Sequence, residues 1–112
     1  MKTHYLGELD ELVLLATSIL HKEAYAFAIK RLIKKQAQRT IALPTIHAAL
    51  YRLEKRGFLR SEMGGATPER GGRRKRLFTI TNAGMQALRD VQATRERMWG
   101  LLRDVRPAGG LS

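Results

Sequence analysis

Apolar residues recur at helical spacing near the start of the chain. Residues 6–20 carry leucines, Val13, Ala16 and Ile19 along one stripe, which predicts a first helix from about Leu6 to Leu20. Leu14 widens this stripe, and a helix that is apolar on more than one side is often shared with a second subunit. The same spacing returns over residues 23–38 and predicts a second helix.

A third helix is predicted from Pro44 to about Arg56. Proline fits the first turn of a helix, where its missing N–H is no loss, and Gly57 is a natural stop in a left-handed conformation. The period of the pattern then changes from 3.6 to 2 residues, which predicts strands over residues 58–63 and 74–81.

The connection between these strands, residues 64–73, is too long for a tight turn and is rich in Gly and Arg. Three helices followed by such a hairpin are typical of a winged helix-turn-helix, with the hairpin as the wing. The expected fold is therefore mainly α with a small β-hairpin. We expect residues 1–81 to form this DNA-binding domain.

A last helix is predicted from about Asn82 to Val105, with Thr81 as its N-cap. Its apolar residues follow a 4-3 repeat that resembles a coiled-coil seam, with Gly84 and Arg95 as two defects. So long a helix extends beyond a small domain and needs a partner, which predicts a homodimer.

The C-terminal dimerisation helix is expected to span residues 82–106, and residues 107–112 are expected to form a disordered tail. The residues assigned to the dimer interface are Leu9, Leu12, Leu88, Val91, Arg95, Met98, Trp99 and Leu102. Trp99 is interpreted as dimer core, and only secondarily as a ligand platform. Arg95 is expected either to reach the edge of the seam or to pair with an acid of the partner.

The charge of the chain is concentrated in its middle. The formal net charge is +11, and residues 30–76 hold fourteen of the 21 Lys and Arg residues but only three of the ten Asp and Glu residues. A basic block inside a folded segment indicates a polyanion partner. The alternative is a basic surface that is merely solvated.

Other compositional features exclude several classes of protein. The chain has no cysteine, so it has neither a disulfide framework nor a thiolate metal site, and we expect no metal or cofactor. Its longest apolar run, residues 12–20, is far shorter than the roughly 20 residues of a membrane span. No secretory signal pattern is present, so a cytoplasmic location without membrane association is expected. No nucleophile and base stand at motif spacing, so enzyme activity is not expected.

In a winged helix-turn-helix the third helix enters the major groove of double-stranded DNA. The residues expected to contact DNA are Tyr25, Thr45, His47, Ala48, Tyr51, Arg52, Lys55, Arg70, Arg73, Arg74, Lys75 and Arg76. Strand alternation sends neighbours among residues 73–76 to opposite sides, so not all of them can face the duplex. A locally hydrogen-bonded His47 and a Tyr25 that packs between helices are the alternatives to DNA contact.

Three runs of residues resemble the PadR family of transcriptional regulators. The run LPTIHAALYRLEKRG, residues 43–57, resembles the recognition helix of that family. The run TPERGGRRKR, residues 67–76, resembles its wing, and LFTIT followed by Gly84 resembles the strand and helix start after it. Pro44 and His47 depart from the family pattern, which leaves DNA binding in place but puts the target sequence in doubt.

The resemblance implies a short PadR protein, a homodimer that represses transcription from a pseudo-palindromic operator. Some members of the family release DNA when a small molecule enters near the dimer interface, so an effector of unknown identity is a further expected partner. Two alternatives stay open: a non-specific architectural nucleic-acid-binding protein, and a ligand-binding protein whose DNA role is lost.

Overall fold

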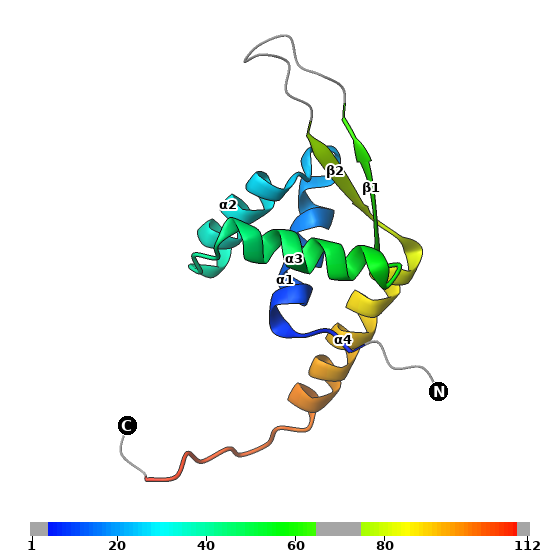
Figure 1. The fold of residues 1–112 in the computed structure, drawn as a ribbon. Helices are drawn as coiled ribbons and strands as arrows, with labels where there is room; N and C mark the ends of the chain where they lie inside the picture. The colour runs from blue at the N-terminus through cyan, green and yellow to red at the C-terminus, as the bar shows by residue number, and fades with distance from the viewer. Residues whose placement is uncertain (1–4, 65–74, 110–112) are drawn as a thin grey trace.

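A computed structural model describes residues 5–64 and 75–109 of the chain (Figure 1). The elements in these residues are α1 (Glu8–Leu20), the 3-10 helix η1 (His21–Glu23), α2 (Ala26–Ala37), α3 (Leu43–Lys55), β1 (Leu59–Met63), β2 (Arg76–Ile80) and α4 (Asn82–Gly100). The predicted fold class is confirmed, because the helices and the two-stranded antiparallel sheet follow one another in the order of a winged helix.

The helices α1, α2 and α3 and the hairpin enclose one apolar core. Both α2 and α3 pack against α1, and α3 crosses in front of α1 in the view of Figure 1. The largest fully buried side chains are Val13, Leu14, Thr17, Ile29, Ile46, Leu50, Leu53 and Leu59. Each buried aliphatic side chain of this size stabilises the fold by about 1.5–3 kcal/mol relative to an exposed one. The core therefore fixes α3 relative to the hairpin.

Both ends of α3 lie close to where the sequence predicts them. Pro44 lies in its first turn, and Gly57 after its last turn has a φ of +82°, a left-handed conformation that glycine adopts without strain. The Phe58 amide then donates to the Leu53 carbonyl at 2.9 Å. The chain turns sharply there into β1.

The second helix begins later than the sequence predicts, at Ala26 instead of about residue 23. The Phe78 amide of β2 donates to the Ala24 carbonyl at 2.9 Å, and Tyr25 has an extended backbone. Pairing with β2 therefore holds residues 24 and 25 outside the helix, and this tertiary contact has no local sequence signal.

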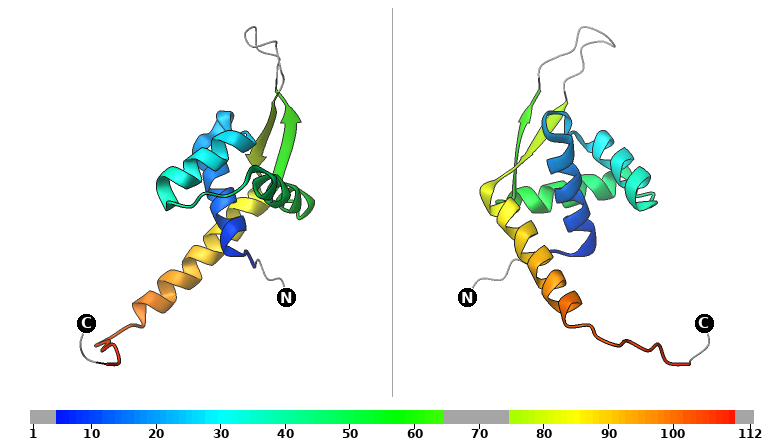
Figure 2. Two further views of the ribbon diagram at one scale, coloured as in Figure 1. Left: turned by 60° about the vertical axis from the view of Figure 1, so that its left-hand side comes forward. Right: turned by 180° about the vertical axis from the view of Figure 1, so that it is seen from behind.

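The last helix, α4, runs away from the three-helix core on the side opposite the hairpin (Figure 2). The predicted N-cap is confirmed, because the Thr81 hydroxyl accepts a hydrogen bond from the Gly84 amide at 3.1 Å. The helix ends at Gly100, five residues before the predicted end at Val105. Glycine is a weak helix former, and the next amide, that of Leu101, bonds to Met98 in a tighter turn.

Two interpretations of the apolar pattern were wrong. Gly84 is not a defect in an exposed seam: it is buried, and it lies against the Phe58 carbonyl and Ile80 of its own chain. Leu14 does not widen the outer face of α1, because its side chain is fully buried in the core. The outward apolar residues of α1 are Leu15 and Ile19, which are 40% and 66% exposed.

Within residues 5–64 and 75–109, no helix has the length and apolar character that a bilayer crossing needs.

Candidate nucleic-acid interface

One face of α3 packs on the core and the opposite face is open to solvent. Ile46, Ala49, Leu50 and Leu53 point inward and are buried. All six α3 residues selected from the sequence are exposed: Thr45, His47, Ala48, Tyr51, Arg52 and Lys55. The first three positions of this set carry small or uncharged side chains, which lets the helix backbone approach a partner closely.

A groove separates this exposed face from the hairpin. It has a volume of about 670 Å³ and lies between α3, with His47, Ala48 and Tyr51, and β2, with Arg76 and Phe78. A second hollow of about 570 Å³ adjoins it, since His47, Arg76 and Phe78 line both. That hollow reaches Tyr25 and Phe27 at the start of α2 and Lys75, which precedes β2 at the loop end of the hairpin. The interface is therefore concave, with an apolar floor and a cationic rim.

Lys75 and Tyr25 meet at one side of this hollow. The Lys75 ammonium lies 4.0 Å from the centroid of the Tyr25 ring, within the range of a cation–π interaction. Tyr25 is half-buried and also adjoins the Ala24 carbonyl that accepts from β2. The hairpin is thus tied to the start of α2 by one backbone hydrogen bond and one side-chain contact. Tyr25 takes part in packing, and its contact with DNA stays a prediction.

Arg76 has different partners from Lys75, as strand alternation predicts. Its Nη1 donates to the Ser61 hydroxyl at 3.0 Å, and this hydroxyl donates to Oε2 of Glu54 at 2.8 Å. Glu54 lies on α3 and Ser61 on β1, so the three side chains connect α3 to both strands. Sequence reasoning missed Glu54 and Ser61, because neither residue is basic or lies at an expected contact position.

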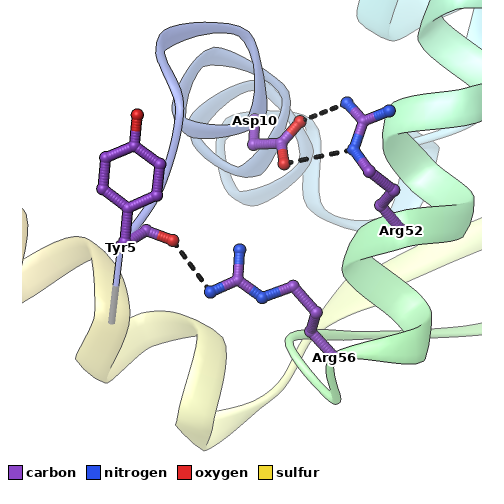
Figure 3. A network of polar contacts seen from close by, with 4 residues as sticks. All are labelled: Tyr5, Asp10, Arg52 and Arg56. Atoms are coloured by element: carbon purple, nitrogen blue, oxygen red, sulfur yellow. Dashed lines mark hydrogen bonds and ion pairs between the residues drawn. The ribbon is translucent and has the colours of Figure 1, made fainter. Parts of the chain in front are cut away.

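Arg52 is turned toward α1 (Figure 3). Its Nη2 donates to Oδ1 of Asp10 at 2.6 Å, and its Nε donates to Oδ2 at 3.4 Å. Hydrogen bonding to Asp10 raises the pKa of the Arg52 guanidinium, with the attraction of the carboxylate adding to this and desolvation opposing it. Asp10 is 9% exposed, and it is the buried acid that this contact satisfies. Arg52 therefore joins α3 to α1, and its expected contact with DNA stays a prediction.

Arg56, the C-cap residue that follows the last residue of α3, contacts the start of the chain. Arg56 donates to the Tyr5 carbonyl at 2.8 Å (Figure 3), and its guanidinium stands 4.7 Å from the Phe58 ring. Lys55 is different, because its ammonium lies over the Tyr51 ring at 5.9 Å on the exposed face. The two arginines thus anchor α3 to the start of the chain, whereas Lys55 lies beside the solvent-facing aromatic ring.

Three of the basic residues expected to contact DNA, Arg70, Arg73 and Arg74, lie outside the described residues. Their contact with DNA stays a prediction.

The residues assigned to a dimer interface divide into two groups. Leu9, Leu12, Leu88 and Val91 pack against the core of their own chain, and Leu88 is only 8% exposed. Met98, Trp99 and Leu102 are more than half exposed. Arg95 pairs with Glu11 of α1 at 2.8 Å, within the same chain, where the sequence left open an edge position or an acid of a partner. The homodimer itself stays a prediction.

Comparison with known proteins gives this architecture a family. The sequence profile of the transcriptional regulator PadR-like family matches residues 14–90, which is more than half of the chain. No curated protein sequence matches the chain significantly.

Several solved structures share the fold. A PadR-like transcription factor from Bacteroides fragilis is 26% identical, with a TM-score of 0.68 over 82% of this chain and 84% of that one. A PadR family transcriptional regulator from Eggerthella lenta is 28% identical, with a TM-score of 0.63 over 83% of this chain and 80% of the other. Bacillus subtilis PadR, solved in complex with operator DNA, is 18% identical, with a TM-score of 0.60 over 94% of this chain and 53% of its own. That last likeness concerns the fold alone.

Proposed function

This chain belongs to the transcriptional regulator PadR-like family, and on that premise we propose that it is a sequence-specific repressor that binds double-stranded DNA as a homodimer. The operator is pseudo-palindromic, because a two-fold symmetric dimer presents two equivalent reading surfaces. Half-sites about one helical turn apart, roughly 34–36 Å, fit such a dimer.

The observation that carries this proposal is the exposed face of α3 beside the cationic start of β2, where Lys75 and Arg76 lie. Thr45, His47 and Ala48 stand on the solvent side of the helix, and the groove next to them ends at Arg76. A helix fits the major groove, where each base pair shows a distinct pattern of donors and acceptors. In this arrangement the start of α3 reads bases, while Arg76 and Lys75 contact phosphates and position the helix.

The proposed dimer uses the exposed apolar side chains at the end of α4. Met98, Trp99 and Leu102 are 66%, 72% and 52% exposed. Apolar patches of this kind are rare on monomeric proteins. A second copy of α4 covers them in the proposed assembly.

Release of DNA by a small-molecule effector is the regulatory part of the proposal. A groove of about 410 Å³ between α1 and α4 supports it, with Leu15, Met85 and Leu88 among its lining residues. An effector in this groove would act at the proposed dimer face and away from α3.

The second candidate function is non-specific, architectural binding of nucleic acid through charge alone. The observation that favours it is the concentration of basic residues in the middle of the chain. This function gives no role to the small or uncharged side chains at the start of the exposed α3 face, Thr45, His47 and Ala48.

Selection of bound sequences from a random pool of DNA duplexes tests the two functions against each other. The repressor proposal requires an enriched, two-fold symmetric sequence that outcompetes random DNA. Specific sites usually bind their proteins about 10³- to 10⁷-fold more tightly than random DNA. Enrichment of no sequence, with strong salt-dependent binding to the whole pool, would favour the architectural function.

A further inference from the structure

The hydrogen-bonded chain from Glu54 through Ser61 to Arg76 has a direction. The Ser61 hydroxyl uses its one hydrogen on the Glu54 carboxylate and accepts from Arg76 with a lone pair. Glu54 and Ser61 are half-buried, whereas Arg76 is exposed. The series of hydrogen bonds thus begins on α3 and ends in a cation that lines the groove between α3 and β2.

We infer that Glu54 and Ser61 are positioning residues, which hold the Arg76 guanidinium in place for one phosphate of the DNA backbone. This inference rests on the proposed function, because it assigns a DNA contact to a described site. It gives two uncharged or acidic residues, Ser61 and Glu54, an indirect role in DNA binding that they exert through Arg76.

The chemistry of the three groups suits this role. A guanidinium has five N–H donors, and the hydrogen bond to Ser61 uses one of them. The remaining donors form a planar fork that matches the oxygens of a phosphate. Because the Glu54 carboxylate polarises the Ser61 hydroxyl, it strengthens the hydrogen bond that this hydroxyl accepts from Arg76.

The placement of Arg76 supports the same conclusion. Arg76 shares a strand face with Phe78, whose side chain is buried, so Arg76 points toward α3. An arginine on a flexible loop loses rotamer freedom when it binds a phosphate, whereas one that is already held loses less. Lys75 lacks this arrangement, since its ammonium rests on the Tyr25 ring.

Two matched pairs of variants test the role of the hydrogen bonds that connect Glu54, Ser61 and Arg76. Ser61→Thr and Ser61→Val have nearly the same shape and both favour strands, but only threonine keeps the hydroxyl. Glu54→Gln and Glu54→Met have similar length, but only glutamine keeps an acceptor oxygen. Fluorescence anisotropy with a random-sequence duplex of about 30 base pairs, roughly three helical turns, measures Kd over a series of salt concentrations.

We expect Ser61→Thr to bind like the native chain and Ser61→Val to bind about three- to tenfold more weakly, the usual range for one lost hydrogen bond. Glu54→Met should likewise bind more weakly than Glu54→Gln. Arg76→Ala should lower the slope of log K against log salt by about 0.9, the value for one phosphate. Adding Ser61→Val to Arg76→Ala should weaken binding no further, because the positioned group is already absent.

Equal affinities within both matched pairs would overturn the inference, as would independent effects of Ser61→Val and Arg76→Ala that multiply in the double variant. Thermal unfolding of each variant identifies a folding defect, and if Ser61→Val is unfolded the Glu54 pair decides. Failure of the proposed function looks different, because the selection experiment would then enrich no sequence, whatever the affinities of these variants. If the chain does not bind DNA at all, the native chain itself shows no salt-dependent binding to the duplex.

Discussion

Gly84, in the first turn of α4, packs against the backbone carbonyl of Phe58 so closely that no Cβ fits between them. The same carbonyl accepts a hydrogen bond from the Thr81 amide at 3.0 Å. The Thr81 hydroxyl in turn donates to the Gly57 carbonyl at 2.6 Å. The end of α3 and the start of α4 are therefore joined by backbone contacts and by the Thr81 hydroxyl.

Gly84→Ala should destabilise the fold by about 1–3 kcal/mol, the usual cost of overpacking a closed site, because backbone must move to admit the methyl group. Gly100→Ala is the matched control, since a Cβ there meets nothing within 4 Å and Gly100 also lies in α4. Urea unfolding measures both free energies. Equal stability of the two variants would contradict the close approach of Gly84 to Phe58.

Asp10→Ala should destabilise the fold by about 1 kcal/mol, because it removes the acceptor of both Arg52 hydrogen bonds. Hydrogen bonds to charged groups contribute about 1.5–3 kcal/mol to the free energy of unfolding when they are shielded from solvent. Arg52 is half-exposed, so solvent screens this pair and lowers its contribution. Arg39→Ala, which breaks the exposed pair with Glu8, is the control and should change stability by less than about 0.5 kcal/mol. Equal losses below about 0.5 kcal/mol for both variants would contradict this prediction and mean that solvent screens both pairs alike.

Thr45→Ala and His47→Ala should reduce the preference for the selected operator over random DNA by about 1–3 kcal/mol each, because contacts with base edges specify the sequence. Lys55→Ala should weaken binding to both kinds of DNA to a similar extent, as the loss of a phosphate contact does. Competition binding with operator and random duplexes measures this preference. If Thr45→Ala and His47→Ala behave like Lys55→Ala, α3 does not read the sequence.

Replacement of Met98, Trp99 and Leu102 together by Asp should convert a homodimer into a folded monomer. These side chains are exposed in one protomer, so the three aspartates leave its core intact. A partner that covers them must desolvate their charges, which opposes dimerisation. Light scattering at micromolar concentration gives the mass, and circular dichroism reports the fold. Met63→Asp, at an exposed apolar residue of β1, is the control and should leave the mass unchanged.

A native chain that scatters as a monomer would contradict this prediction and the two-fold operator with it.

The sequence predicts what depends on local periodicity and turn chemistry. Pro44 and Gly57 bound α3 to within a residue or two, and Thr81 caps α4, because these effects act over one helical turn. The exposure of six selected residues on α3 follows from the 3.6-residue period alone.

The rest depends on contacts between residues far apart in the chain. Ala24 stays outside α2 because β2 binds it, and Arg52 faces α1 because Asp10 is there. A basic residue on the polar side of a helix gives no signal that distinguishes an internal partner from a phosphate. The same holds for Leu14 and Leu15, which are neighbours in sequence but take opposite roles through the packing of α2 and α3.

Consecutive residues of α1 hold two different helices: Asp10 binds Arg52 of α3, and Glu11 binds Arg95 of α4. Neighbouring positions on a helix point about 100° apart, so the first turn of α1 contacts α3 on one side and α4 on another. Any rotation of this turn moves both attachments at once. The orientation of this one turn therefore contributes to the angle between α3 and α4, together with the direct contacts between Phe58 and the start of α4.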